Sequence, residues 1–157
     1  MTKERIQQFT LRVTQANATD LVVILYEMLL EYIDEAKEAS SQGDNAALAE
    51  AVRKSRNVLN ELLESLDMKY EPAPNLRKLY FFCLRKLVHA QAGKEGALDE
   101  ICKVIIPLRD AYAQIAAFNE NGPVMGNSQT VYAGLTYGRN DLTENMADQG
   151  VNRGMRV

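Results

Sequence analysis

The chain has 157 residues, of which 46% are hydrophobic and 25% charged, a composition typical of a single globular domain. Its formal net charge of −3 argues against a nucleic-acid partner, which usually requires a basic face. No apolar run is long enough to cross a membrane, and the start, MTKERIQQF, has no apolar signal core. We therefore expect a cytoplasmic protein without membrane insertion.

The first 17 residues are expected to form a short segment ahead of the first long helix. They are mostly polar, with a few apolar side chains such as Phe9, and are compatible with a short amphipathic segment or a frayed end. Asn17 followed by Asp20 resembles a capping box, in which each side chain bonds the other residue's backbone N–H. The first long helix is therefore predicted over residues 18–40.

Three further helices are predicted from apolar residues that recur at spacings of three and four. They cover residues 46–66, 75–92 and 97–118. The breaks between them fall at Gly43, at Pro72 with Pro74, and at Gly93 with Gly96. Pro107 lies inside the last helix and is expected to bend or open it locally. The predicted fold class is all-α, an antiparallel up-down four-helix bundle within residues 1–118.

The width of the apolar stripes is the feature of the sequence that bears most on function. The first long helix has one seam made of Leu21, Leu25, Met28, Leu29, Tyr32 and Ala36. A second seam, rotated by about 100°, consists of Val22, Tyr26, Leu30 and Ile33. The later helices add flanking apolar residues, of which we select Phe81, Val88, Val104 and Ile106. Two interpretations remain open: a fully packed core with ordinary surface residues, or an exposed groove for an amphipathic partner helix.

The groove interpretation predicts a partner site at the second seam and the four flanking residues. Tyr26→Asp together with Ile33→Asp would then weaken peptide binding by more than tenfold while the chain stays helical. Unfolding of this double variant would instead identify the two side chains as core.

Residues 119–157 form a tail of different composition, rich in glycine and asparagine, and are expected to be flexible or docked. Within it, VYAGLTYG at residues 131–138 concentrates apolar and aromatic side chains. We predict that this segment packs on the bundle or on a neighbouring chain and competes with the partner. The alternatives are a disordered tail and a tail that binds something else.

The residues that catalysis or metal binding would need are not grouped in the sequence. His89, the single histidine, falls on the polar side of its predicted helix. Cys83 and Cys102 lack the further ligands of a structural zinc site and are expected to be free thiols. We therefore expect no enzyme, no metal and no cofactor.

Several segments in order resemble the FliS family of flagellin-specific export chaperones. They are LYEMLLEYIDEA from Leu25, LLESLDMKY from Leu62, NLRKLYFFCLRKLVHA from Asn75 and LRDAYAQI from Leu108. The similarity covers roughly residues 13–117 and contains no catalytic signature.

The resemblance implies a cytoplasmic chaperone that binds the C-terminal segment of flagellin and prevents premature polymerisation. It also implies delivery of flagellin to the flagellar export apparatus, without a cofactor. The alternative is a helical adaptor or assembly protein that binds another protein, or forms a homo-oligomer, through an exposed apolar groove.

Overall fold

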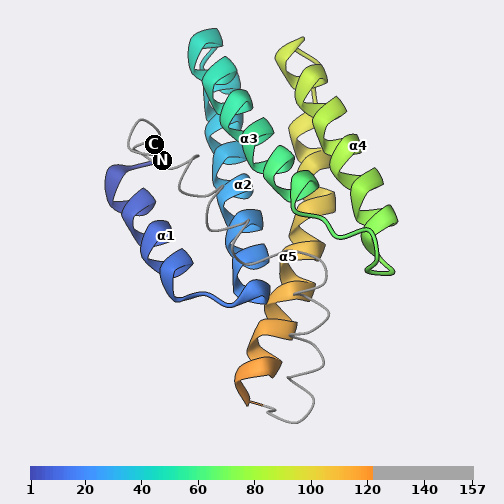
Figure 1. Cartoon of the computed structure of the whole chain (residues 1–157). Helices are drawn as coiled ribbons and strands as arrows, with labels where there is room; N and C mark the ends of the chain where they lie inside the picture. Colours follow the sequence, from blue (N-terminus) through green and yellow to red (C-terminus); the bar gives the residue numbers. More distant parts are fainter. Residues whose placement is uncertain (122–157) are drawn as a thin grey trace.

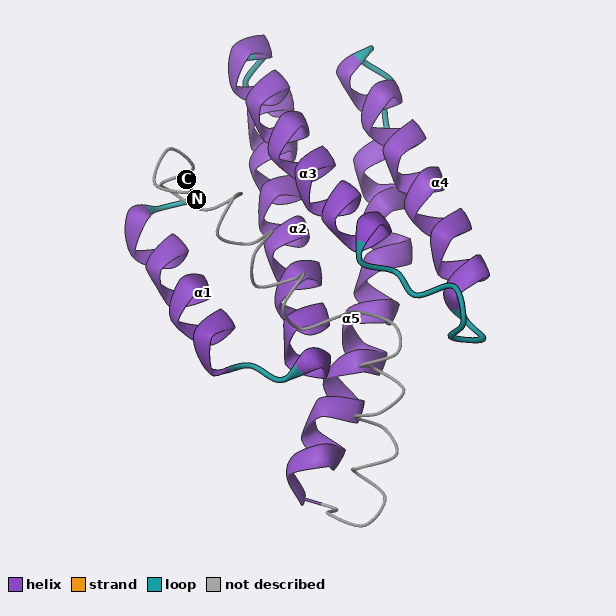
Figure 2. Cartoon of the chain, in the orientation of Figure 1, coloured by secondary structure: helices purple, strands orange, loops and turns teal. Residues whose placement is uncertain are grey.

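The computed structural model describes residues 1–121, and within that range every regular element is a helix (Figures 1 and 2). The helices are α1 (Lys3–Gln15), α2 (Ala18–Ser41), α3 (Asn45–Glu64), α4 (Ala73–Gln91) and α5 (Ala97–Asn121). Residues 122–157, which include the predicted VYAGLTYG segment, lie outside the described residues. None of the helices within residues 1–121 combines the length and apolar character that crossing a lipid bilayer requires.

Helices α2 to α5 pack as a ring in which α2 contacts α3 and α5, and α4 contacts the same two helices. Two contacts between α2 and α5 show the relative direction of these helices. Lys37, late in α2, pairs with Asp99, early in α5, whereas Thr19, early in α2, bonds Asn119, late in α5. The two helices are therefore antiparallel.

Local sequence signals explain where the helices begin and end. Asn17 and Asp20 form the predicted capping box at the start of α2, and Asp44 caps α3. Gly43 has a φ of 68°, in the left-handed region that side chains with a Cβ rarely adopt, so glycine suits the turn between α2 and α3. Pro74 lies in the first turn of α4, where its missing N–H breaks no helical bond.

The number of helices is the main departure from the prediction. The described residues form five helices, because the N-terminal segment is helix α1, with Thr2 as its N-cap. α5 also continues through Pro107 and extends to Asn121, three residues beyond the predicted end. The predicted domain boundary at residue 118 therefore falls inside α5.

The core lies around α2, which is covered on nearly all sides. Six consecutive residues of this helix, Leu21 to Tyr26, are all buried. Because successive residues on a helix are about 100° apart, six in a row point in all directions around the axis. A helix that is apolar all round is a buried helix, and α2 is enclosed by α3 and α5 together with α1.

Candidate functional site

Helix α1 lies antiparallel to α2 at the edge of the molecule, away from α4 (Figure 1). Three ion pairs join the two helices in reverse order along the chain. The N-terminal ammonium of Met1 pairs with Glu35, Arg5 with Glu31 at 2.5 Å, and Arg12 with Glu27 at 2.5 Å. This ion-pair ladder fixes the position of α1 along α2.

The apolar side of α1 consists mainly of Phe9 and Val13, which are 1% and 6% exposed. The guanidinium groups of Arg5 and Arg12 lie over the Phe9 ring, 4.5 and 5.6 Å from its centroid. The two arginines of the ladder therefore also shield the aromatic ring. Leu11, on the opposite side of α1, remains 59% exposed.

The surface beneath α1 can be located on α2 from the ladder. At about 100° per residue, Ile24 and Met28 lie about 20° and 60° around the helix from Glu31. Since Glu31 holds α1, we infer from these angles that the two side chains lie toward the same side; both are buried. We call Ile24, Met28 and the three glutamates of the ladder the α1-covered face.

The charges of the ladder affect the protonation of its members. Partial burial, followed by the nearby charge of Lys54, lowers the pKa of the Met1 amino group, while Glu31 opposes this shift. The hydrogen bond to Glu31 raises the pKa of Arg5. Within residues 1–121 no group of three or more histidine, cysteine, aspartate or glutamate residues is placed to hold a metal ion. The α1-covered face, with buried apolar side chains beside a row of carboxylates, is suited to binding another helix.

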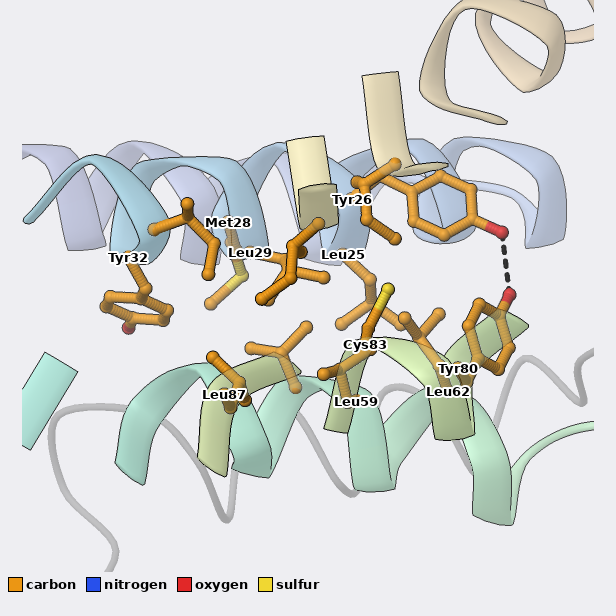
Figure 3. Packing of buried hydrophobic residues seen from close by; sticks show 14 of the residues in the cluster. Leu25, Tyr26, Met28, Leu29, Tyr32, Leu59, Leu62, Tyr80, Cys83 and Leu87 are labelled. Atoms are coloured by element: carbon orange, nitrogen blue, oxygen red, sulfur yellow. Dashed lines mark hydrogen bonds between the residues drawn. The ribbon is translucent and has the colours of Figure 1, made fainter. Parts of the chain in front are cut away.

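Three of the eight positions selected from the sequence lie in the interior. Val22, Tyr26 and Ile33 are 0% exposed, so in this conformation a partner cannot touch them. The Tyr26 hydroxyl lies 2.6 Å from that of Tyr80 on α4 (Figure 3). The second seam of α2 is apolar because it packs on other helices, and periodicity alone cannot distinguish this from an open groove.

The other five positions keep some exposed surface. On α4, Phe81 is 40% and Val88 63% exposed, and on α5 Ile106 is 39% exposed. Leu30 and Val104 are partly buried against the core. The eight residues therefore do not form one surface, because three of them are buried in the interior while the other five keep some contact with solvent.

The sequence interpretation did not select Phe9, Val13 or Ile24. A signal for α1 was present, since Ile6, Phe9 and Val13 recur at spacings of three and four. Thr2 is the N-cap of α1, and its hydroxyl oxygen accepts a hydrogen bond from the backbone N–H of Arg5, three residues later. Nothing in the pattern showed that α1 would lie on α2.

Comparisons with known proteins agree on one family. The sequence profile of the family described as flagellar protein FliS matches residues 1–119. The chain is similar to the flagellar secretion chaperone FliS of Bacillus subtilis (strain 168), with 28% identity over 103 residues. That match covers 65% of this chain and 77% of the relative. It is also similar to the flagellar secretion chaperone FliS of Salmonella typhimurium (strain LT2), with 29% identity over 116 residues, 69% of this chain and 86% of the relative. Because the profile matches about three quarters of its length, this chain belongs to the FliS family of flagellar proteins.

Proposed function

We propose that this chain is a cytoplasmic chaperone of flagellar export that binds the C-terminal segment of flagellin. It keeps flagellin from polymerising early and assists its delivery to the export apparatus. Membership of the FliS family and two relatives named as flagellar secretion chaperones support this function. The work consists of covering apolar surface on an export substrate, for which no cofactor is needed.

The observation that carries the proposal is the way α1 sits on α2. An amphipathic helix buries Phe9 and Val13 against a neighbouring helix, with charged pairs along the contact. This is the helix-in-groove mode by which many proteins bind a partner helix. A helical segment of flagellin with a similar apolar stripe can take the place of α1 on the α1-covered face.

The energies make such an exchange feasible. Burial of a Phe or Val side chain stabilises by about 1.5–3 kcal/mol, and exposed ion pairs typically contribute about 0–1 kcal/mol each. The entropy of ordering α1 offsets part of this stabilisation. A longer amphipathic helix that covers Ile24, Met28 and neighbouring surface therefore gains enough to displace α1.

Of the residues selected from the sequence, Leu30, Phe81, Val88, Val104 and Ile106 have exposed or partly exposed surface and remain candidate contacts. Val22, Tyr26 and Ile33 would take part only if the partner separated α2 from its neighbours. We place the first contacts at the α1-covered face, because α1 can leave without disturbing the packing of α2 with α3 and α5.

The test is calorimetric titration of a flagellin C-terminal peptide into the wild-type chain, Phe9→Ser and Leu11→Ser. Phe9→Ser loosens α1 and should tighten binding about threefold or more, since a larger fraction of the protein is then open. Leu11→Ser removes an exposed apolar residue from the same helix and should bind like the wild type. No binding to any of the three chains would contradict the flagellin function. Equal binding to all three would retain the function and contradict the site.

A helical adaptor that binds a protein other than flagellin is the alternative. The exposure of Phe81 and Val88 on α4, away from α1, is the observation that favours it. The same titration separates the two functions, because an adaptor of this kind would not bind the flagellin peptide.

A further inference from the structure

The outward side of α4 combines apolar and basic side chains. We define the α4 face as Arg77, Lys78, Phe81, Arg85 and Val88. All five lie within about 60° of Phe81 around the helix axis, and all five are exposed. Phe81 and Val88 are two turns apart and are among the most exposed large apolar residues of the described part.

The charge of this face is unbalanced. Between Ala73 and Gln91, α4 has four arginine and lysine residues and no aspartate or glutamate, although the whole chain is acidic. Lys86 pairs with Glu100 on α5. Within residues 1–121 the cations of the α4 face form no ion pair, whereas Arg5 and Arg12 on α1 are both paired.

The aromatic ring of the face is already next to a positive charge. The guanidinium carbon of Arg77 lies 5.2 Å from the centroid of Phe81. A partner that covers Phe81 must therefore pass close to Arg77 and its neighbours. An acidic segment would complement the charge of the α4 face, and a few apolar side chains on that segment would cover its apolar residues.

The chain contains one segment of this kind after α5. All three acidic residues of the stretch 122–157 fall within DLTENMAD, at residues 141–148, and no basic residue interrupts them. Leu142, Glu144, Met146 and Asp148 occupy alternate positions, so in an extended conformation they share one side. Leu142 and Met146 would then be about 13 Å apart, close to the ~10.5 Å rise between Phe81 and Val88.

The connecting chain is long enough to reach. Nineteen residues, 122–140, separate the end of α5 from Asp141 and can span up to about 63 Å. The whole of α5, with its 25 residues, is about 37 Å long at 1.5 Å per residue. α4 packs directly against α5, so its outward face lies within this range.

We propose that residues 141–148 of the chain's own C-terminal tail dock on the α4 face, with the acidic side chains beside Arg77, Lys78 and Arg85 and the apolar ones over Phe81 and Val88. A tethered segment has a high local concentration, so modest complementarity is enough to keep the face covered. The docked tail shields α4 from other proteins independently of what binds at the α1-covered face.

The test is zero-length cross-linking of the full chain with a carbodiimide, which activates a carboxylate for attack by a lysine amine. The amide forms and the carbodiimide, having taken up the elements of water, leaves as its urea. Mass spectrometry should find Lys78 joined to Asp141, Glu144 or Asp148. These links should exceed those to Lys94 at least fivefold, because Lys94 is also exposed but lies outside the α4 face. Links to Lys78 should also fall at least threefold in 0.5 M NaCl, which screens the charges.

Two full-length variants supply the matched comparison. Phe81→Ser with Val88→Ser alters exposed residues only and should lower the links at Lys78 at least threefold without loss of helix. Leu11→Ser removes an exposed apolar residue on the far side of the molecule and should leave them unchanged. An equal mixture of ¹⁴N- and ¹⁵N-labelled chains distinguishes links within one chain from links between two.

The outcomes are decisive in each case. Links within single chains that depend on Phe81 and Val88 support the proposal. Links only between differently labelled chains would assign the α4 face to a second copy and overturn it. Two other results would also overturn it. One is an even distribution of tail links over the exposed lysines Lys69, Lys78 and Lys94, and the other is the absence of tail links at Lys78.

Discussion

The hydroxyl oxygens of Tyr26 and Tyr80 lie 2.6 Å apart in the interior and join α2 to α4 across the bundle. The ring of Tyr26 also packs against that of Tyr112 on α5, with centroids 5.9 Å apart. Tyr26 thus connects three helices, which gives it a structural role in this conformation. This relationship changes what is expected of a substitution at Tyr26.

Tyr26→Asp combined with Ile33→Asp is expected to unfold the protein. Both positions are fully buried, and an unpaired carboxylate there costs several kcal/mol in addition to the lost packing. The total approaches the roughly 5–15 kcal/mol by which domains are usually stable. Circular dichroism during thermal unfolding should show little helix and no cooperative transition.

The matched control is Phe81→Asp combined with Val88→Asp on the exposed side of α4. It introduces the same number of carboxylates at surface positions, where substitutions usually change the free energy of unfolding by less than about 0.5 kcal/mol each. A cooperative, wild-type-like transition in the Tyr26 and Ile33 variant would show that these residues are not core.

Glu31→Gln is expected to loosen α1 on α2. The change removes the ion pair with Arg5, which is partly exposed and contributes about 0.5–1 kcal/mol at most. Hydrogen exchange at the buried part of α1 should therefore accelerate about two- to fivefold, as the opening free energy falls.

Asp34→Asn provides the comparison on the same helix. Asp34 is exposed and forms no ion pair within the described residues, so its substitution should leave α1 protected. Equal acceleration in both variants would mean that the charge of α2 as a whole, rather than the ladder, holds α1.

Cys83 should make the protein less stable at alkaline pH. Burial raises the pKa of its thiol from 9.0 to about 12, with Cys102 nearby adding to the shift. Below pH 9 the thiol is protonated in both the folded and the unfolded chain. Between pH 9 and 12 only the unfolded chain loses the proton, so the free energy of unfolding falls by up to about 1.4 kcal/mol per pH unit.

Denaturant unfolding of the wild type and of Cys83→Ala at pH 8, 9, 10 and 10.5 measures this effect. The variant lacks the thiol, so its stability should decrease less steeply with pH, whatever its stability at pH 8. Identical slopes would indicate that Cys83 is accessible to water in the folded protein.

The segment VYAGLTYG lies outside the described residues, so its docking on the bundle stays a prediction. A chain that ends at Asn121 should bind a flagellin C-terminal peptide more tightly than the full chain does. It should also bind more of an apolar-surface dye, because a competing segment has been removed. Equal affinity and equal dye binding would exclude competition by the tail.

The sequence predicted the helical elements well where the signal was local. The capping pair Asn17 and Asp20 and the breaks at Gly43 and Pro74 act through bonds within a few residues. Helix α1 was left open as an amphipathic or frayed segment, because a helix of 13 residues is stable mainly through the surface on which it packs.

The candidate site was predicted less well, since its residues depend on contacts between helices. Val22, Tyr26 and Ile33 read as a surplus apolar seam, yet they are interior because α2 is enclosed by its neighbours. Ile24 and Phe9 were not selected, although both are buried.

The sequence alone therefore determined the helical class, most helix ends and the resemblance to the FliS family, all of which follow from local periodicity and residue order. The tertiary structure decided which apolar residues are covered and by which helix. A helical wheel gives the direction of a side chain around its own axis, but not what lies opposite it. That depends on how α1, α3 and α5 pack around α2, through contacts between residues far apart in the chain.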